Sequence, residues 1–215
     1  MNVILGEPMG PVSVRGIYAI TPDTEDTKAI LSRTRKLLLA GVRLFQYRSK
    51  SGDKKLKFEQ ALRLSETIKS FGGIFIVNDS LELSTKVKAD GVHLGKDDMS
   101  VEKARAIYPA PFLIGASCYN DIGLAHKAAY NGADYVAFGS FFLSSTKPLA
   151  TKAYPSIIRE CKNSLNIKVV AIGGIEANNV DRIMGYGADA VAMSSALFDN
   201  QDIETTVSKI RKYTS

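Results

Sequence analysis

The chain has 215 residues, 45% of them hydrophobic, and a formal net charge of +6. This length suffices to bury a sizeable core, and no apolar run approaches the roughly 20 residues of a membrane-spanning helix. The basic residues are spread over many segments without interleaved aromatic residues. We therefore expect small anionic substrates as partners rather than nucleic acid or a membrane.

The N-terminal segment, MNVILGEPMGPVS, is rich in glycine and proline and lacks the pattern of a signal peptide. We expect residues 1–15 to form an irregular leader. Cys118 and Cys161 make no disulfide framework, and no Cys/His cluster has the spacing of a zinc site. This composition predicts reduced thiols in a cytoplasmic protein, with Cys118 structural rather than nucleophilic.

Eight short apolar segments recur along the chain, and each is expected to be a strand. They are GIYAIT (16–21), VRLFQYR (42–48), IFIVND (74–79), GVHL (91–94), FLIGASC (112–118), YVAFGS (135–140), KVVAIGGI (168–175) and AVAMSS (190–195). The similarity of NGADYVAFGS and YGADAVAMSS shows that the chain repeats one structural unit.

Helical spacing of apolar residues separates these strands. The expected helices are 25–40, 54–70, 99–107, 120–132, 176–186 and 200–212, with short helices after the third and sixth strands. Strands that alternate with helices favour parallel pairing, because a parallel neighbour needs a crossover connection. We predict a single-domain α/β fold over residues 1–215, a (β/α)₈ TIM barrel, with an open doubly wound sheet as the alternative.

Polar residues gather where the predicted strands end, which is where a barrel of this type places its active site. Gln46, Arg48 and Lys50 alternate at the end of the second strand, so we expect all three side chains to point into the barrel mouth. The other candidates are Asn78, Asp79, Asp98, Ser117, Ser144, Thr146, Lys147, Gly173, Gly174, Ser194 and Ser195.

The charges among these candidate residues indicate an anionic ligand with a metal ion. Arg48, Lys50 and Lys147 can neutralise several negative charges, and the small residues after the last two strands let backbone N–H groups approach a phosphate. Asp79 and Asp98 would repel a polyphosphate unless Mg²⁺ lies between them, since Mg²⁺ binds one or two carboxylates together with phosphate oxygens. The alternative is that each acid forms an ion pair with Arg48 or a lysine.

Seven motifs, QYRSK, VNDS, GVHLGKDD, GAS, SSTK, AIGGI and MSSA, occur in the order found in thiamine phosphate synthases, and the resemblance covers roughly residues 16–212. The family joins a pyrimidine methyl pyrophosphate to a thiazole phosphate and releases pyrophosphate. The resemblance implies that Gln46, Arg48, Lys50 and Asn78 contact the pyrimidine pyrophosphate, with Ser117 and Lys147 adding pyrophosphate contacts. It further implies Mg²⁺ on Asp79 and Asp98, and thiazole phosphate contacts from Ser144, Thr146, Gly174, Ser194 and Ser195.

The family's chemistry is regarded as dissociative, so Arg48, Lys50, Ser117 and Lys147 are the candidate catalytic residues and no general base is obligatory. Three positions depart from the usual family pattern: Lys96 replaces Gln, Ser140 replaces Pro, and Ser144 replaces Thr. None of these changes removes a group that the chemistry requires.

Two alternatives on the same barrel are a thiazole tautomerase and a non-catalytic sensor of phosphorylated thiamine precursors. The tautomerase resemblance is weakened because that enzyme uses a histidine where this chain has Ser140. Among the two histidines, His93 is expected to be packed inside the protein and His126 to face solvent. The sequence is compatible with a monomer and with a homo-oligomer.

Overall fold

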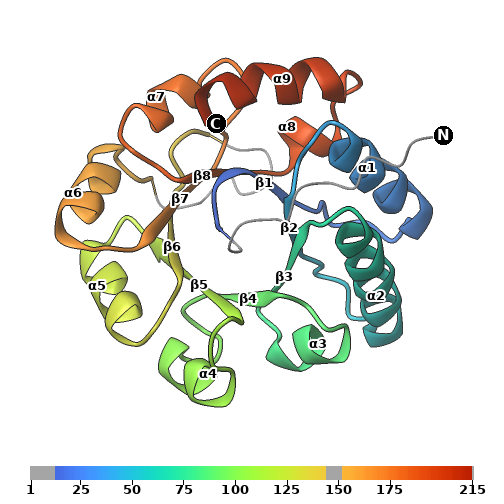
Figure 1. Cartoon of the computed structure of the whole chain (residues 1–215), viewed down its shortest axis with the longest axis horizontal. Coiled ribbons are helices and arrows are strands. Elements are labelled where there is room, and N and C mark those ends of the chain that lie inside the picture. The colour runs from blue at the N-terminus through green and yellow to red at the C-terminus, as the bar shows by residue number, and fades with distance from the viewer. Residues whose placement is uncertain (1–12, 144–151, 215) are drawn as a thin grey trace.

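The computed structural model describes residues 13–143 and 152–214. Eight parallel strands form a closed barrel in which each strand pairs with its neighbours in chain order and β8 pairs with β1. Figure 1 looks down this barrel and shows the strands as an inner ring surrounded by helices. The prediction of a single (β/α)₈ barrel is confirmed, and the open-sheet alternative is wrong because the sheet closes.

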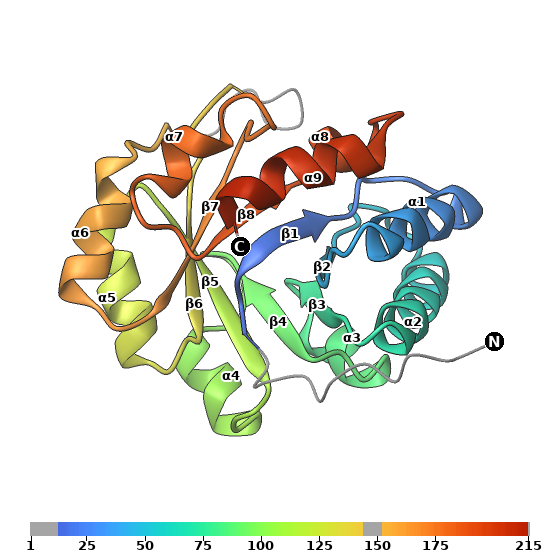
Figure 2. The same ribbon diagram turned by 45° about the horizontal axis from the view of Figure 1, so that its top comes forward.

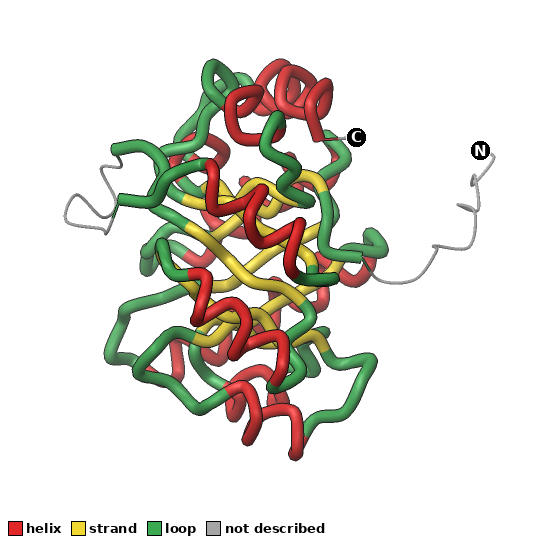
Figure 3. Tube along the Cα trace, turned by 90° about the vertical axis from the view of Figure 1, so that its left-hand side faces the viewer, coloured by secondary structure: helices red, strands yellow, loops and turns green. Residues whose placement is uncertain are grey.

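The strands are short and lie close to the predicted positions. They are β1 (Gly16–Ile20), β2 (Leu44–Tyr47), β3 (Ile74–Asn78), β4 (Gly91–Leu94), β5 (Leu113–Tyr119), β6 (Tyr135–Phe138), β7 (Lys168–Ile172) and β8 (Ala190–Met193). In Figure 3 they cross the middle of the molecule at a slant, with helices packed on the outside.

The helices follow the strands as expected, with two differences. They are α1 (Thr27–Leu39), α2 (Lys54–Ser70), α3 (Leu81–Lys86), α4 (Val101–Ile107), α5 (Ile122–Tyr130), α6 (Ser156–Ser164), α7 (Val180–Met184), α8 (Ser195–Phe198) and α9 (Ile203–Thr214). Helix α7 begins later than predicted because Asn179 accepts a hydrogen bond from the Glu176 N–H and forms a turn there. Helix α8 was not predicted, since four residues are too few for a helical period.

Local capping explains where the first five helices begin. Each starts after an Asp or Ser whose side chain accepts a hydrogen bond from a backbone N–H of the first helical turn. These capping residues are Asp26, Asp53, Ser80, Ser100 and Asp121. Figure 2 shows α8 and α9 beside α1, so the last two helices complete the ring where the barrel closes.

Side chains inside the barrel and side chains between strands and helices form separate cores. The inner core includes Tyr18, Leu44, Ile76 and Tyr135. The outer core is larger and packs the opposite faces of the strands against the helices. Of the predicted leader, residues 1–12 lie outside the described part of the chain, and residues 13–15 form neither helix nor strand.

The repeated Ala-Asp segments have a structural role at the opposite end of the barrel from the candidate site. Asp90, Asp134 and Asp189 each precede an even-numbered strand, and each carboxylate accepts a backbone N–H from the neighbouring strand at 2.6–2.8 Å. Each also forms an ion pair with a lysine or arginine. The repeat therefore stabilises the amino-terminal ends of the strands.

Candidate active site

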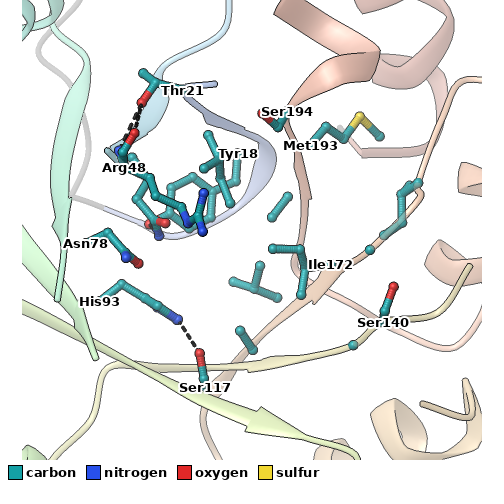
Figure 4. Close-up of a pocket in the computed structure, with 18 of the residues that line it drawn as sticks. Tyr18, Thr21, Arg48, Asn78, His93, Ser117, Ser140, Ile172, Met193 and Ser194 are labelled. Atoms are coloured by element: carbon teal, nitrogen blue, oxygen red, sulfur yellow. Dashed lines mark hydrogen bonds between the residues drawn. The ribbon is translucent and has the colours of Figure 1, made fainter. Parts of the chain in front are cut away.

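A cavity of about 880 Å³ opens at the carboxyl ends of the strands. Its lining includes ten of the predicted residues: Gln46, Arg48, Asn78, Asp79, Asp98, Ser117, Gly173, Gly174, Ser194 and Ser195. Figure 4 shows several of these side chains converging from different strands. The structure therefore brings these ten residues together at the carboxyl ends of the strands, and their roles toward a ligand stay predictions.

The end of β2 supplies an amide and a guanidinium to the cavity. Gln46 is only 3% exposed and lies on the inner face of the strand. The backbone of Arg48 is held by Thr21, whose Oγ1 accepts the Arg48 N–H at 2.9 Å and donates to the Arg48 carbonyl at 3.2 Å. This pair of hydrogen bonds fixes the chain just beyond the last residue of β2.

Lys50 does not continue this alternation, and the expectation that it points into the cavity with Gln46 and Arg48 is wrong. Strand β2 ends at Tyr47, so the two-residue period no longer applies three residues later. Lys50 is exposed and is not among the lining residues, although its N–H donates to Asp23 Oδ1 at 2.9 Å. It lies at the rim of the cavity beside Asp23, which does line it.

The two acids approach the cavity from consecutive loops. Asp79 follows β3 with a φ of 64°, and its N–H donates to the His93 carbonyl at 2.8 Å. Asp98 lies in the loop after β4, where its Oδ2 accepts the Gly95 N–H at 2.7 Å. Hydrogen bonds with backbone groups thus hold both residues, and both line the same cavity as Asn78.

Ser117 and His93 are hydrogen-bonded to each other inside the barrel. Ser117 Oγ lies 2.9 Å from His93 Nε2 (Figure 4). His93 is 8% exposed and its Nδ1 lies 3.1 Å from the hydroxyl of Tyr135, so it is packed as expected. His126 is exposed on α5, also as expected.

The loops after β7 and β8 bring backbone groups to the cavity. Gly174 has a φ of 60°, and a Cβ built there would overlap with the carbonyl oxygen of Leu143. Only glycine adopts this positive φ without strain and also has no Cβ to overlap with that carbonyl oxygen. Ser194 and Ser195 lie where β8 passes into α8 and line the same cavity.

Some of the predicted residues cannot be placed. Ser144, Thr146 and Lys147 lie outside the described residues. Of the three departures from the family pattern, Lys96 and Ser140 both line the cavity, and Ser140 Oγ donates to the Phe142 carbonyl at 2.8 Å. Lys96 therefore adds a cation to a cavity that already contains Arg48.

Sequence reasoning missed Tyr18, which lies in the cavity floor. Its hydroxyl accepts a hydrogen bond from Gln46 Nε2 at 2.9 Å, and its side chain is 1% exposed. The alternation within β1 places Tyr18 and Ile20 on the inner face, and that period was the available signal.

Comparison with known proteins identifies the family. The family model described as thiamine monophosphate synthase matches residues 17–197. The chain belongs to the thiamine monophosphate synthase family. The thiamine-phosphate synthase of Thiobacillus denitrificans is 43% identical over 197 residues, covering 92% of this chain and 93% of that protein. That of Chromobacterium violaceum is 45% identical over 192 residues, covering 89% and 92%.

A solved structure supports the same assignment. The thiamine phosphate pyrophosphorylase from Pyrococcus furiosus superimposes with a TM-score of 0.81 at 32% identity, covering 92% of this chain and 94% of that one. The 3-hexulose-6-phosphate synthase of Salmonella typhimurium gives a TM-score of 0.68 at 17% identity, which shows a shared fold alone.

Membership of the thiamine monophosphate synthase family makes the chain a transferase, as its sequence resemblance implied. Neither the tautomerase nor the sensor alternative finds support in these comparisons. Among the helices of the described residues, none combines the length and apolar character needed to cross a membrane.

Burial determines the character of the two cysteines. Cys118 is 1% exposed on β5 and Cys161 is fully buried on α6. Burial raises the pKa of the Cys118 thiol to about 12 and that of the Cys161 thiol to about 11. Both thiols are free and stay protonated near neutral pH, so neither is suited to act as a nucleophile.

Proposed function

We propose that this protein joins 4-amino-2-methyl-5-(diphosphooxymethyl)pyrimidine to 4-methyl-5-(2-phosphooxyethyl)thiazole, giving thiamine phosphate and pyrophosphate. The thiazole nitrogen supplies the electron pair of the new C–N bond, and the electrons of the broken C–O bond leave with pyrophosphate. Family membership supports this reaction. We place the reaction in the cytoplasm, with two small-molecule substrates and no nucleic-acid or membrane partner.

The observation that carries the proposal is the meeting of Arg48, Asp79 and Asp98 in one cavity with the backbone of Gly174 and Ser194. A cation beside two carboxylates suits a pyrophosphate that binds with a metal ion, and the loops after β7 and β8 suit a second phosphate. The cavity volume of about 880 Å³ lies at the upper end of the range for ligand sites, which fits two substrates bound together.

The residues present fit Mg²⁺. Asp79 and Asp98 offer hard carboxylate oxygens at one mouth, and the described residues contain no cluster of three or more His, Cys, Asp or Glu side chains that would favour a closed protein cage. Mg²⁺ characteristically keeps water and substrate phosphate oxygens as its remaining ligands. Bound between these acids, it would neutralise charge on the pyrophosphate as the C–O bond breaks.

The chain's own residues then serve mainly to stabilise the leaving group. Arg48 at the end of β2 is a cation inside the cavity, and Ser117 supplies a hydroxyl from β5. The family resemblance adds positive charge from Lys147 and from Lys50 at the rim. Preorganised donors of this kind are more effective in a cavity than in water, because they need no reorganisation during the reaction. A general base is not required, since the attacking thiazole nitrogen already has its lone pair.

The direct test mixes both substrates with the purified protein and Mg²⁺ and separates the products by chromatography. Thiamine phosphate and pyrophosphate should form in equal amounts, and omission of either substrate should abolish thiamine phosphate. If neither product forms with any divalent cation although both substrates bind, the proposed reaction is wrong and a sensor function gains support.

A further inference from the structure

Five buried or half-buried side chains form a continuous hydrogen-bonded chain across the barrel, below the cavity. We call Gln46, Tyr18, Tyr135, His93 and Ser117 the floor network. Successive hydrogen bonds measure 2.9 Å from Gln46 to Tyr18, 2.9 Å between the two tyrosine hydroxyls, 3.1 Å to His93 Nδ1 and 2.9 Å from His93 Nε2 to Ser117 Oγ. The network connects β2, β1, β6, β4 and β5 in that order.

Packing holds the middle of the floor network in one arrangement. Tyr18 and Tyr135 are 1% and 0% exposed and meet edge to face with their ring centroids 6.0 Å apart. His93 stacks on Tyr135 at 5.5 Å between centroids. A Cβ at Gly115 would overlap with the Tyr135 ring, so glycine on β5 makes the space that this ring occupies. The tyrosine hydroxyls therefore bond within the barrel rather than to bulk water.

Gln46 sets the direction of the hydrogen bonds. Its Nε2 donates to the Tyr18 oxygen, and each phenol has a single proton to donate. Burial raises the pKa of both Tyr18 and Tyr135, so both keep that proton at neutral pH. The Tyr18 oxygen already accepts from Gln46, so the arrangement that uses both phenol protons within the network has Tyr18 donating to Tyr135 and Tyr135 donating to His93 Nδ1.

The direction continues through the imidazole. A neutral histidine carries one N–H, so an Nδ1 that accepts a proton donor leaves the hydrogen on Nε2. His93 Nε2 then donates to Ser117 Oγ, and the proton of the Ser117 hydroxyl is left for a ligand in the cavity. At the opposite end, the amide oxygen of Gln46 remains an acceptor.

We propose that Tyr18, Tyr135 and His93 are positioning residues that hold Ser117 as a hydrogen-bond donor to an acceptor atom of the substrate. The assignment of that substrate rests on the proposed function, whereas the direction of the floor network does not. A ligand lying across the floor is matched when it offers an acceptor to Ser117 and a donor to Gln46. The network thus selects the orientation in which a substrate of mixed donors and acceptors binds.

The tautomer of His93 tests the direction without substrate. Long-range ¹H–¹⁵N correlation spectra of the ¹⁵N-labelled protein should show two imidazoles, because the chain has two histidines, and a His126→Gln variant assigns them. We expect His93 with its hydrogen on Nε2 alone. A hydrogen on Nδ1 alone, or on both nitrogens, would overturn the proposal.

Removal of one hydroxyl tests whether the direction is transmitted. Tyr135→Phe keeps the ring but removes the donor to His93 Nδ1, so the spectrum should change to a mixture of tautomers. Tyr130→Phe is the matched control, because Tyr130 is 92% exposed on α5 and belongs to no part of the floor network. The proposal fails if Tyr135→Phe leaves the His93 pattern unchanged.

Kinetics test whether the effect passes through Ser117. Tyr135→Phe and Tyr18→Phe should each lower kcat/KM by roughly five- to thirtyfold, the size expected from one or two kcal/mol for a disturbed buried hydrogen bond. In a Ser117→Ala background the same changes should cost less than about twofold, because the hydroxyl through which the tyrosines act is then absent. If the full cost persists in that background, the tyrosines do not act through Ser117. A wild-type protein with the expected His93 tautomer but no turnover would reject the proposed function and leave the direction of the network standing.

Discussion

At the scale of single residues, burial and backbone geometry decide which side chains can take part in chemistry. Cys118 follows Ser117 on β5, yet alternation along the strand places the serine in the cavity and the cysteine in the outer core. The cavity floor is polar where side chains are held by hydrogen bonds, as at Gln46 and His93. Chemistry at this site therefore depends on strand register as much as on residue type.

Cys118→Ala should retain most of the turnover, because the thiol is buried away from the cavity and its raised pKa keeps it protonated. We expect a loss of stability of roughly 1 kcal/mol, typical of a small truncation in a core. Steady-state kinetics and denaturant unfolding measure the two effects. A fall in turnover of a hundredfold or more in a folded variant would show that the thiol has a catalytic role.

Gly174→Ala should impair both stability and phosphate binding. The positive φ disfavours alanine by about 1–2 kcal/mol, and the new Cβ would displace the backbone at Leu143. We expect KM for the thiazole phosphate to rise by about tenfold, the equivalent of one weakened charge-assisted hydrogen bond. Gly52→Ala is the control, since Gly52 has open space around it and no positive φ. Equal KM values in the two variants would argue against a phosphate site here.

The sequence predicts part of the site because alternation and strand ends are local features. Gln46 and Ser117 could be found in this way, whereas Lys50 could not, since the end of β2 at Tyr47 is set by the loop that follows. The bond between Tyr18 and Tyr135 joins residues 117 positions apart. Only the closure of the barrel brings these two hydroxyls together, so no local pattern signals the floor network.

At the scale of elements, the repeated unit explains why the fold was predictable. Helices alternate with short apolar strands, and the eight strands close with parallel pairing, while Ala-Asp turns precede β4, β6 and β8. Helix α8 was missed because its four residues show no periodicity. The aspartates at the start of β4, β6 and β8 serve the fold at the end of the barrel away from the cavity.

Asp189, at the start of β8, provides a test of how these aspartates stabilise the fold. Burial on its own would raise the pKa of Asp189, but hydrogen bonds from Lys162, the Val169 N–H and Lys168 bring the pKa below its ordinary value of 3.8. Because the folded pKa is the lower one, the ionised carboxylate stabilises the protein above the unfolded value. That contribution is lost as the pH falls through the folded pKa.

Asp189→Asn should lower the free energy of unfolding at pH 7 by about 1–3 kcal/mol, the cost of disturbing one partner of a buried hydrogen-bonded group. The difference in the free energy of unfolding between wild type and Asp189→Asn should stay constant above about pH 5 and become smaller below pH 3.8. Denaturant titrations across this range measure it. Glu59→Gln, at an exposed ion pair with Arg63, should change stability by less than about 0.5 kcal/mol. An equal effect of the two changes would contradict the role of Asp189.

At the scale of the whole molecule, the two ends of the barrel have different tasks. The amino-terminal ends of the strands carry the ion-paired aspartates, and the carboxyl ends form the cavity with Arg48, Asp79 and Asp98. This division leaves the loops at the cavity free to carry charged groups without weakening the strand pairing. We expect these groups to act together on a pyrophosphate that leaves with Mg²⁺.

A magnesium titration of steady-state turnover tests this joint action, using wild type, Asp98→Asn and Lys147→Ala. Asparagine keeps an acceptor for the Gly95 N–H, so Asp98→Asn should shift the titration to higher Mg²⁺ and recover activity in excess metal. Lys147→Ala should keep the wild-type midpoint but lose about 10²–10³ in maximal rate, by analogy with the loss of one preorganised donor. Wild type should make no thiamine phosphate in EDTA. Equal product with and without EDTA would show that turnover does not need Mg²⁺, and an unchanged midpoint in Asp98→Asn would show that Asp98 does not hold the metal.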